Sequence, residues 1–336
     1  MHRTGIHRGL RRLAAAGIAA ALALGLAACG DDGDGGDGDK GSGGVTITHK
    51  LGTTTVKEPP KRIVALGEID QDAALALGAN LVGVVYTTEP NGVAPWAQPK
   101  LGAAKPELIQ GGDNGYPIEK VLALKPDLIL ANADYWVEQE YEKLSKIAPT
   151  TAFETGPSQD TWQQVTRQVG KALGKSAEAE KLVADVEGKI AAVGTQYPEI
   201  KGKSFALTNA QNAGTIAVLK DKEDTSVKLL AGFGMTHPQS IADLPGAGFA
   251  AELSMERLDV LEVDVLLSNY NGDAALQKSI EANPQFTKLD VVKRGSYVAL
   301  DSNEFYALRA PTPLSLQYVI DKIIPKIAQA AKAPRG

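Results

Sequence analysis

Short apolar runs alternate with helical patterns along most of the chain. A run of four or five aliphatic or small residues predicts a buried strand, and apolar residues that recur every three or four positions predict an amphipathic helix. Six strands are predicted in this way, at residues 62–66, 81–85, 127–131, 204–208, 264–268 and 296–300. Strands that alternate with helices are typical of an α/β protein whose sheets are covered by helices.

The longest helical pattern covers residues 176–196. Its apolar stripe consists of Leu182, Val183, Val186, Ile190 and Val193. Ser176 has the side chain expected of an N-cap. A helix of about 20 residues is roughly 30 Å long, which is enough to run from one domain to another. The sequence therefore predicts a helical connection between two domains.

Two segments of the chain repeat each other. Residues 119–130 and 256–267 each begin with an acidic, a basic and an apolar residue. Both segments end with an Asp that is followed by three aliphatic residues. Weaker matches relate 144–147 to 286–289 and 61–66 to 203–207. Chance similarity of two helix–strand units is the alternative, because such units share their binary pattern. The number of matched positions favours two related lobes.

The repeat places Glu119 and Glu256 at equivalent positions. Ile118, Val121 and Leu122 are predicted to face the core, so that Glu119 points outward from a helix that starts after Pro117. Met255 and Leu258 are likewise predicted to face the core, so that Glu256 points outward from a helix with Ser254 as its N-cap. Each glutamate could also be an ordinary solvated residue at a helix start.

The N-terminal segment has the features of an export signal. Four arginines precede an apolar stretch over 13–28, and Leu26-Ala27-Ala28-Cys29 contains the only cysteine of the chain. This motif resembles the lipobox of bacterial lipoproteins, which implies cleavage of residues 1–28 and acylation of Cys29. An ordinary secretory signal is the alternative, and Arg11-Arg12 leaves Sec and twin-arginine export both open. With no second cysteine, we expect no disulfide.

Residues 29–44 follow as a lipidated cysteine and a Gly- and Asp-rich tether. A tether of this composition has nothing to bury and would span on the order of 20 Å. Without the four arginines of the signal, 31 basic residues remain against 40 acidic ones, a formal charge of −9. This charge disfavours nucleic acid and anionic lipid surfaces as partners.

Candidate binding residues follow the carboxyl ends of the predicted strands, where open parallel sheets bind ligands. The favoured set is Tyr86, Trp96, Trp136, Tyr270, Tyr306 and Arg309. The other candidates are Glu68, Tyr116, Asp134, Tyr135, Asn209, Gln211, Asn212, Asn271, Asn303 and Phe305. Tyr and Trp offer flat contact area, and Arg pairs with anionic oxygens. Each aromatic side chain could instead fill the core.

Other classes of function are less favoured by the sequence. After cleavage only His49 and His237 could act as imidazole ligands, so a site for a bare metal ion is not expected. No Gly-x-Ser-x-Gly motif and no phosphate loop occur, and we expect no enzyme activity. A glycosidase-like carboxylate pair, a haem site with a Tyr ligand and a signalling receptor stay open.

Several segments together resemble one family. They are residues 61–66, 119–130, 141–150, 283–286 and 313–320. They look like the periplasmic-binding-protein family of iron–siderophore ABC importers, which also includes cobalamin and haem binders, and the likeness extends over residues 45–331. It implies the class III fold, in which two α/β lobes are joined by one long helix and hold the ligand between them. The lobes would be residues 45–174 and 198–336, joined by a helix at 175–197.

The resemblance also implies a function. The protein would be a monomer on the extracytoplasmic face of the cell membrane, held by its lipid anchor, with no intrinsic cofactor. It would capture a ferric siderophore and deliver it to an ABC permease dimer. Glu119 and Glu256 would then contact arginines of the two permease subunits, while haem or cobalamin is the alternative ligand.

Overall fold

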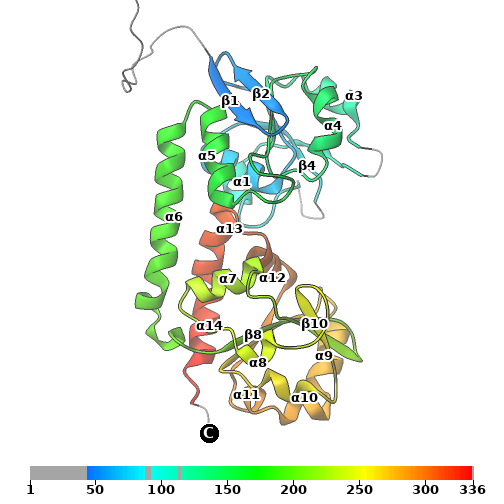
Figure 1. The fold of residues 1–336 in the computed structure, drawn as a ribbon, viewed down its shortest axis with the longest axis vertical. Helices are drawn as coiled ribbons and strands as arrows, with labels where there is room; N and C mark the ends of the chain where they lie inside the picture. The colour runs from blue at the N-terminus through cyan, green and yellow to red at the C-terminus, as the bar shows by residue number, and fades with distance from the viewer. Residues whose placement is uncertain (1–43, 88–91, 113–114, 335–336) are drawn as a thin grey trace, which may run out of the picture. The chain divides into compact units, whose positions relative to one another are not determined.

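The computed structural model describes residues 44–87, 92–112 and 115–334. The predicted signal peptide, Cys29 and nearly all of the tether lie outside these residues. The described part of the chain forms two α/β lobes, with the helix α6 (Ser176–Gln196) alongside both (Figure 1). No helix of these residues is both long and apolar enough to cross a membrane.

Lobe 1 is built on a parallel sheet with the strand order β5-β4-β3-β6-β7. Its strands are β3 (Ile63–Ala65), β4 (Leu81–Val85), β5 (Glu107–Ile109), β6 (Leu128–Ala131) and β7 (Thr150–Ala152). Its helices are α1 (Glu68–Ala76), α2 (Gln98–Leu101), α3 (Ile118–Ala123), α4 (Val137–Leu144) and α5 (Trp162–Ala172). A hairpin of β1 (Val45–His49) and β2 (Gly52–Val56) precedes the sheet.

The sheet of lobe 2 is mixed and has the order β10-β9-β8-β11-β12. Its strands are β8 (Phe205–Asn212), β9 (Thr215–Leu219), β10 (Ala250–Ser254), β11 (Val265–Asn269) and β12 (Tyr297–Leu300). Its α-helices are α7 (Thr225–Gly232), α8 (Gln239–Ala242), α9 (Ala274–Glu281), α10 (Pro284–Lys288), α11 (Asp290–Lys293), α12 (Ser302–Arg309), α13 (Pro313–Tyr318) and α14 (Ile324–Ala331). Shorter turns are the 3₁₀ helices η2 (Pro198–Ile200) and η3 (Leu258–Leu261) and the π-helical segment η4 (Val319–Ile323).

Each sheet lies between two apolar layers, as the continuous apolar runs predict. In β6, Leu128 and Leu130 pack into one apolar cluster and Ile129 and Ala131 into another. In lobe 2, alternate residues of β8 and β11 likewise divide between two clusters. Alternation of side chains along a strand explains this division, because a strand buried on both faces is apolar at every position. The prediction of an α/β fold with two lobes is confirmed.

All six predicted strands exist, but the first strand of lobe 2 continues beyond its predicted end. β8 extends to Asn212 and turns directly into β9, which pairs with it in the antiparallel direction. The Asn212 side chain accepts hydrogen bonds from the Gly214 and Thr215 amides and closes this turn. Asn209, Gln211 and Asn212 therefore belong to a hairpin and not to a loop beyond a parallel strand.

The helix α6 has the bounds that the apolar stripe predicts. Val183, Val186 and Val193 pack into an apolar cluster that is centred on lobe 2, whereas Ala179 packs into one of lobe 1. Ser176 is the first residue of the helix and not its N-cap. The N-cap is Lys175, whose carbonyl accepts a hydrogen bond from the Ala179 amide.

A second segment also connects the lobes. The helix α13 packs against α1 of lobe 1, and Leu314 joins the apolar cluster of that lobe (Figure 1). The chain thus returns to lobe 1 after it has formed the sheet of lobe 2. We therefore propose that lobe 2 comprises residues 198–336 and that its helix α13 forms part of the contact between the two lobes.

The repeat in the sequence has a structural counterpart at the start of each sheet. The Asp127 carboxylate accepts hydrogen bonds from the amides of Lys61 and Arg62, both at 2.8 Å. In lobe 2 the Asp264 carboxylate accepts from the Ser204 amide at 2.8 Å and from its hydroxyl at 2.7 Å. Each aspartate thus holds the start of the first strand of its lobe, which gives the matched Asp a folding role.

Candidate functional site

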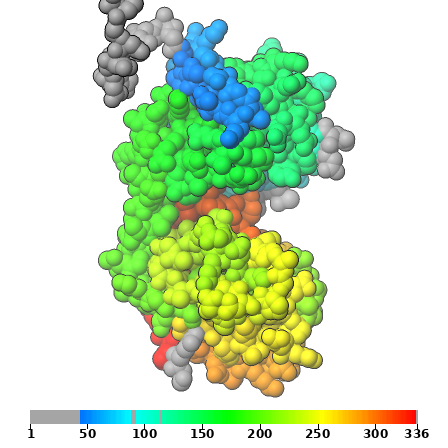
Figure 2. Space-filling model, viewed as in Figure 1, coloured from blue at the N-terminus to red at the C-terminus, as the bar shows by residue number. Residues whose placement is uncertain are grey.

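Three adjoining cavities lie where the two lobes meet. The interlobe cavity, of about 450 Å³, is lined from lobe 1 by Glu68, Asp72 and Trp96 and from lobe 2 by Asn271 and Tyr306, among others. The surface is hollowed between the lobes, with the C-terminal segment in orange at its floor (Figure 2). The expected cleft between the lobes is therefore present.

The lobe-1 cavity, of about 480 Å³, lies over the carboxyl ends of β3, β4, β5 and β6. Tyr86, Gln110 and Trp136 are among its lining residues, and it shares Glu68 and Ala310 with the interlobe cavity. A third space, the rear cavity, lies near α5, α6 and α7 and has a volume of about 590 Å³. Ala310 lines all three, so the cavities adjoin one another.

Buried carboxylates organise the floor of the lobe-1 cavity. Asp70 accepts hydrogen bonds from the Asn132 side chain at 2.5 Å and from the Ala133 amide at 2.9 Å, which fixes the loop after β6 onto α1. Asp134 accepts from the Tyr116 hydroxyl at 2.5 Å and from the Trp136 amide. Burial raises the pKa of Asp70 to about 7 and that of Asp134 to about 6.

A third buried carboxylate joins the lobes. Asp72, on α1, accepts a hydrogen bond from the Trp96 indole at 2.8 Å and another from the hydroxyl of Thr312, the N-cap of α13. Burial raises the pKa of Asp72 to about 7. The Trp96 ring stacks on Tyr306 of lobe 2 with a centroid distance of 6.2 Å, and the tilted ring of Tyr318 has its centroid 5.5 Å from that of Trp96. Trp96 is therefore both a wall of the cavity and a bridge between the lobes.

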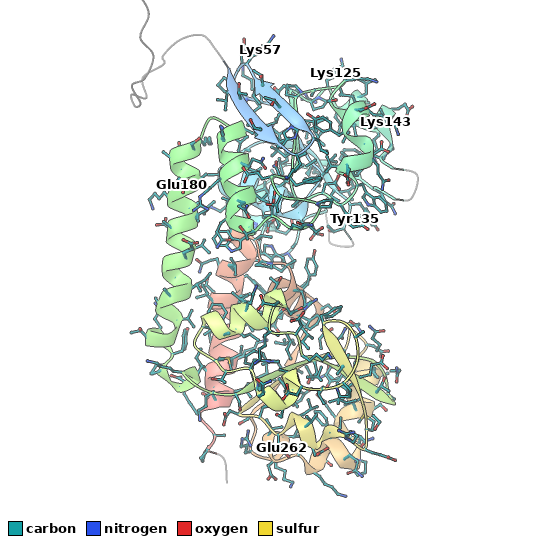
Figure 3. The ribbon with its side chains drawn as sticks, viewed as in Figure 1. Lys57, Lys125, Tyr135, Lys143, Glu180 and Glu262 are labelled. Carbon is teal, nitrogen blue, oxygen red and sulfur yellow. The ribbon has the colours of Figure 1, made fainter. Side chains whose placement is uncertain are left out.

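Four of the six favoured residues line these two cavities: Tyr86, Trp96, Trp136 and Tyr306. The further candidates that line them are Glu68, Tyr116, Asp134, Tyr135, Asn271, Asn303 and Phe305. Tyr135 is 64% exposed and lies on the side of lobe 1 that faces lobe 2 (Figure 3). Their contact with a ligand stays a prediction.

Tyr270 is not brought to these cavities. It is 3% exposed and packs in an apolar cluster of lobe 2, where its hydroxyl hydrogen-bonds to that of Tyr297 at 2.8 Å. Asn269, one residue earlier, lines the interlobe cavity. Since adjacent side chains of an extended strand point to opposite faces, Tyr270 points into the core instead.

Arg309 lines the rear cavity and forms an ion pair with Asp224. Asp224 also accepts hydrogen bonds from the amides of Ser226 and Val227 and so caps α7. The Arg309 guanidinium lies 5.2 Å from the centre of the Phe249 ring. These contacts hold Arg309 within lobe 2, and it lines neither the interlobe nor the lobe-1 cavity.

Sequence reasoning missed several lining residues. They include Gln71, Asp72, Asn269, Ser302 and Thr312. One signal for Asp72 is present in the sequence, since Glu68 and Asp72 are four residues apart in the same helix and therefore share a face. No local signal identifies Thr312, because its partner Asp72 is 240 positions away.

The two histidines have structural contacts. His49 Nε2 lies 2.9 Å from the Thr54 hydroxyl, and His237 Nε2 lies 3.1 Å from the Leu219 carbonyl. Burial lowers the pKa of both imidazoles. Within the described ranges, no group of three or more His, Cys, Asp or Glu side chains is placed to hold a metal ion.

The two matched glutamates are exposed, but their local structures differ. Glu119 lies in the first turn of α3, where Val121 is buried. Leu122 is 56% exposed, so the prediction that it faces the core is wrong. Glu256 lies in a turn between β10 and η3, and Ser254 is the last residue of β10 and not an N-cap.

Comparison with known proteins gives consistent matches. A model of the periplasmic binding protein family matches residues 63–304. The ferric-anguibactin-binding protein FatB of Vibrio anguillarum is 25% identical over 288 residues, which are 83% of this chain and 86% of FatB.

Two solved structures are similar throughout their length. A periplasmic solute binding protein from Mycobacterium smegmatis is 30% identical, with a TM-score of 0.74, over 86% of this chain and 99% of that one. The iron uptake ABC transporter substrate-binding protein PiaA from Streptococcus pneumoniae, in complex with ferrichrome, is 27% identical. That match has a TM-score of 0.65 and covers 87% of this chain and all of PiaA.

Proposed function

The chain belongs to the periplasmic binding protein family, and we propose that it captures a ferric siderophore outside the cytoplasm and delivers it to an ABC importer. Members of this family bind solutes and are not enzymes. FatB is named for ferric anguibactin and PiaA was solved with ferrichrome, so two relatives support a ferric chelate as the ligand.

The observation that carries the proposal is the pair of adjoining cavities, interlobe and lobe-1, between the two lobes. They share Glu68 and Ala310, and each has a volume in the range of small-molecule sites. Tyr86, Trp96, Trp136 and Tyr306 provide aromatic surface, while Gln71, Asn132 and Asn271 provide amides. A siderophore complex presents both kinds of surface, because an organic backbone surrounds its polar iron-binding oxygens.

Tryptophan fluorescence tests this function, since Trp96 and Trp136 line the two cavities. The protein is titrated in parallel with ferrioxamine B, ferric enterobactin, haem and cobalamin. We expect saturable quenching by at least one ferric siderophore, and a loss of most of that signal in Trp136→Phe. Saturation by haem or cobalamin alone would assign the protein to the alternative ligand, and no saturation by any of them would contradict the proposal.

We also propose that Cys29 carries the lipid anchor and that the protein stays on the outer face of the cell membrane. The proposal rests on the motif Leu26-Ala27-Ala28-Cys29 and on the single cysteine. Cys29→Ala should release the protein into the medium or leave it unprocessed. A mature N-terminus at another residue, without lipid, would contradict it in mass spectrometry.

The proposed partner is a permease dimer that contacts both lobes of one monomer. Glu119 and Glu256 are exposed acids, one in each lobe. Charges at the rim of an interface mainly set encounter rate and register, so one exposed acid on each lobe suits a partner with two equivalent basic sites.

A further inference from the structure

The charged residues that line the ligand-binding cavities all have the same sign. The interlobe and lobe-1 cavities are lined by Glu68, Asp72, Asp134 and Asp160, and no Lys, Arg or His is among their described lining residues. In the two internal segments that the structure does not describe, 88–91 and 113–114, the only charged residues of the sequence are Glu89 and Asp113. No cation of those segments can therefore offset the acids.

The basic side chains that line the rear cavity are already paired. Arg309 forms its ion pair with Asp224, and the Lys228 ammonium lies 2.6 Å from the Glu223 carboxylate. Moving either cation toward the other two cavities would break these contacts. The cleft thus lacks the positive groups that recognise an anionic chelate.

Glu68 is the acid with the clearest role for a ligand. It lines both cavities, and its carboxylate has no hydrogen-bond or ion-pair partner among the residues that the structure describes. Burial raises the pKa of Glu68, which shows that its charge is poorly solvated in the free protein. A cation beside it would remove that penalty.

The polar atoms around Glu68 add to the negative potential. The oxygens Gln71 Oε1, Asn132 Oδ1 and Asp134 Oδ2 are buried and have no donor among the described residues. All three residues line the cavities. Tyr135 and Tyr306 are 64% and 39% exposed, and the faces of such rings attract cations. These unpaired acceptors and aromatic faces favour a ligand that brings hydrogen-bond donors and positive charge.

We propose that the cleft selects ferric siderophores that carry a protonated amine, such as a ferric trihydroxamate with a free ammonium, and that Glu68 pairs with this ammonium. This selectivity rests on the proposed function. A polyanionic catecholate or citrate chelate would bring like charges beside four acids in a partly desolvated cavity. Its binding is disfavoured by the same interaction that favours a cation.

A matched pair of ligands isolates the charge. Ferrioxamine B has a neutral iron-binding core and a protonated amine, and its N-acetylated form has the same core without the charge. We expect ferrioxamine B to bind about tenfold more tightly than the acetylated form, which is the size of one partly buried ion pair. Ferric enterobactin, a catecholate complex with negative charge, should bind more weakly than both.

The variant Glu68→Gln assigns the effect to one residue. It should reduce the preference for ferrioxamine B over the acetylated form to about twofold or less. Binding of the acetylated form also shows that the variant is folded. Glu178→Gln, which removes an exposed acid on α6, is the matched control and should keep the full preference.

Two results would overturn the inference while the proposed function stands. One is equal affinity for both ferrioxamines with saturable binding, and the other is tighter binding of ferric enterobactin. A preference that survives in Glu68→Gln would contradict the role of this residue. If none of the ferric chelates saturates the protein, the proposed function itself fails and the inference fails with it.

Discussion

The two lobes share a repeat but contribute differently to the cleft. In each lobe an aspartate, Asp127 or Asp264, holds the start of the first strand. At the carboxyl ends of the strands, where the cavities lie, the two lobes differ. Lobe 1 supplies the acids Glu68, Asp72 and Asp134, whereas the lobe 2 residues that line these two cavities are uncharged.

Buried acids near the cleft are also balanced differently in the two lobes. In lobe 2, Asp224 pairs with Arg309 and Glu304 pairs with Lys326. In lobe 1, Asp70 and Asp72 are fully buried and accept hydrogen bonds only from neutral groups. Neutral donors compensate a buried carboxylate less well than a cation does. Among the described residues, Asp70 and Asp72 of lobe 1 therefore lack a cationic partner, and lobe 2 mainly closes the cavity with aromatic and amide groups.

The largest effect is expected for the two glutamates that we propose as contacts with the permease. Glu119→Arg combined with Glu256→Arg should abolish uptake of the iron-loaded ligand while ligand affinity and melting temperature stay nearly unchanged. The single variants Glu119→Arg and Glu256→Arg compare the contributions of the two lobes to uptake, because Glu119 lies on a helix of lobe 1 and Glu256 in a turn of lobe 2. Uptake is measured with radioactive iron in cells that produce each variant.

Normal uptake by the double variant would contradict the docking role. Loss of ligand binding would instead place the two glutamates in or near the cleft. The control is Glu178→Arg, an equal change of charge on α6, which should leave uptake at the wild-type rate.

The second prediction compares the two strand anchors. Asp264→Ala and Asp127→Ala each leave two donors without an acceptor, which should lower the free energy of unfolding by roughly 2–3 kcal/mol and 1–2 kcal/mol respectively. The loss should be larger in lobe 2, because the contact of Asp264 with Ser204 is partly buried and that of Asp127 is exposed. Denaturant unfolding measures both values, and equal losses would show that burial does not decide them.

The third prediction concerns the stability of the free protein against pH. The pKa of Asp72 is about 7 in the fold and 3.8 in the reference state, so the folded protein binds an extra proton between these values. Stability should therefore fall as pH rises from about 4 to 7. The groups around Asp72 are Trp96, Thr312 and the nearby carboxylate of Glu68.

The Asp72→Asn variant should lose about 1–2 kcal/mol of the stability difference between pH 5.5 and pH 7.5. Thermal unfolding at both pH values checks this, with Glu178→Gln as a control that keeps the wild-type difference. An unchanged pH dependence in Asp72→Asn would show that this carboxylate is ionised throughout the range.

The smallest effect is expected for Arg309→Ala. Because Arg309 is held by Asp224 and lines only the rear cavity among the three described here, its loss should change ligand affinity by less than about twofold. The same variant should destabilise lobe 2, since Asp224 keeps its cap of α7 but loses its cation. A tenfold loss of affinity for an anionic chelate, measured by fluorescence, would contradict this prediction and show that Arg309 contributes to ligand binding.

The sequence alone determined the class of fold and much of the cleft. Strands with apolar residues at every position, such as 128–131, indicate sheets covered on both faces, and the helical pattern over 176–196 predicts α6. The rule for strand ends brought Tyr86, Trp136 and Tyr306 to the cavities, because the carboxyl ends of parallel strands meet at one edge.

Only the tertiary structure decided which polar groups face one another. Tyr270 and Asn269 are neighbours in sequence, yet the pleat of β11 directs one into the core and the other into the cleft. Thr312 reaches Asp72 because α13 returns to lobe 1. Arg309 forms its ion pair with Asp224, which is 85 positions away in the sequence. Such pairings depend on packing between distant segments, which no local pattern of apolar and polar residues encodes, and they determine the charge that a ligand meets.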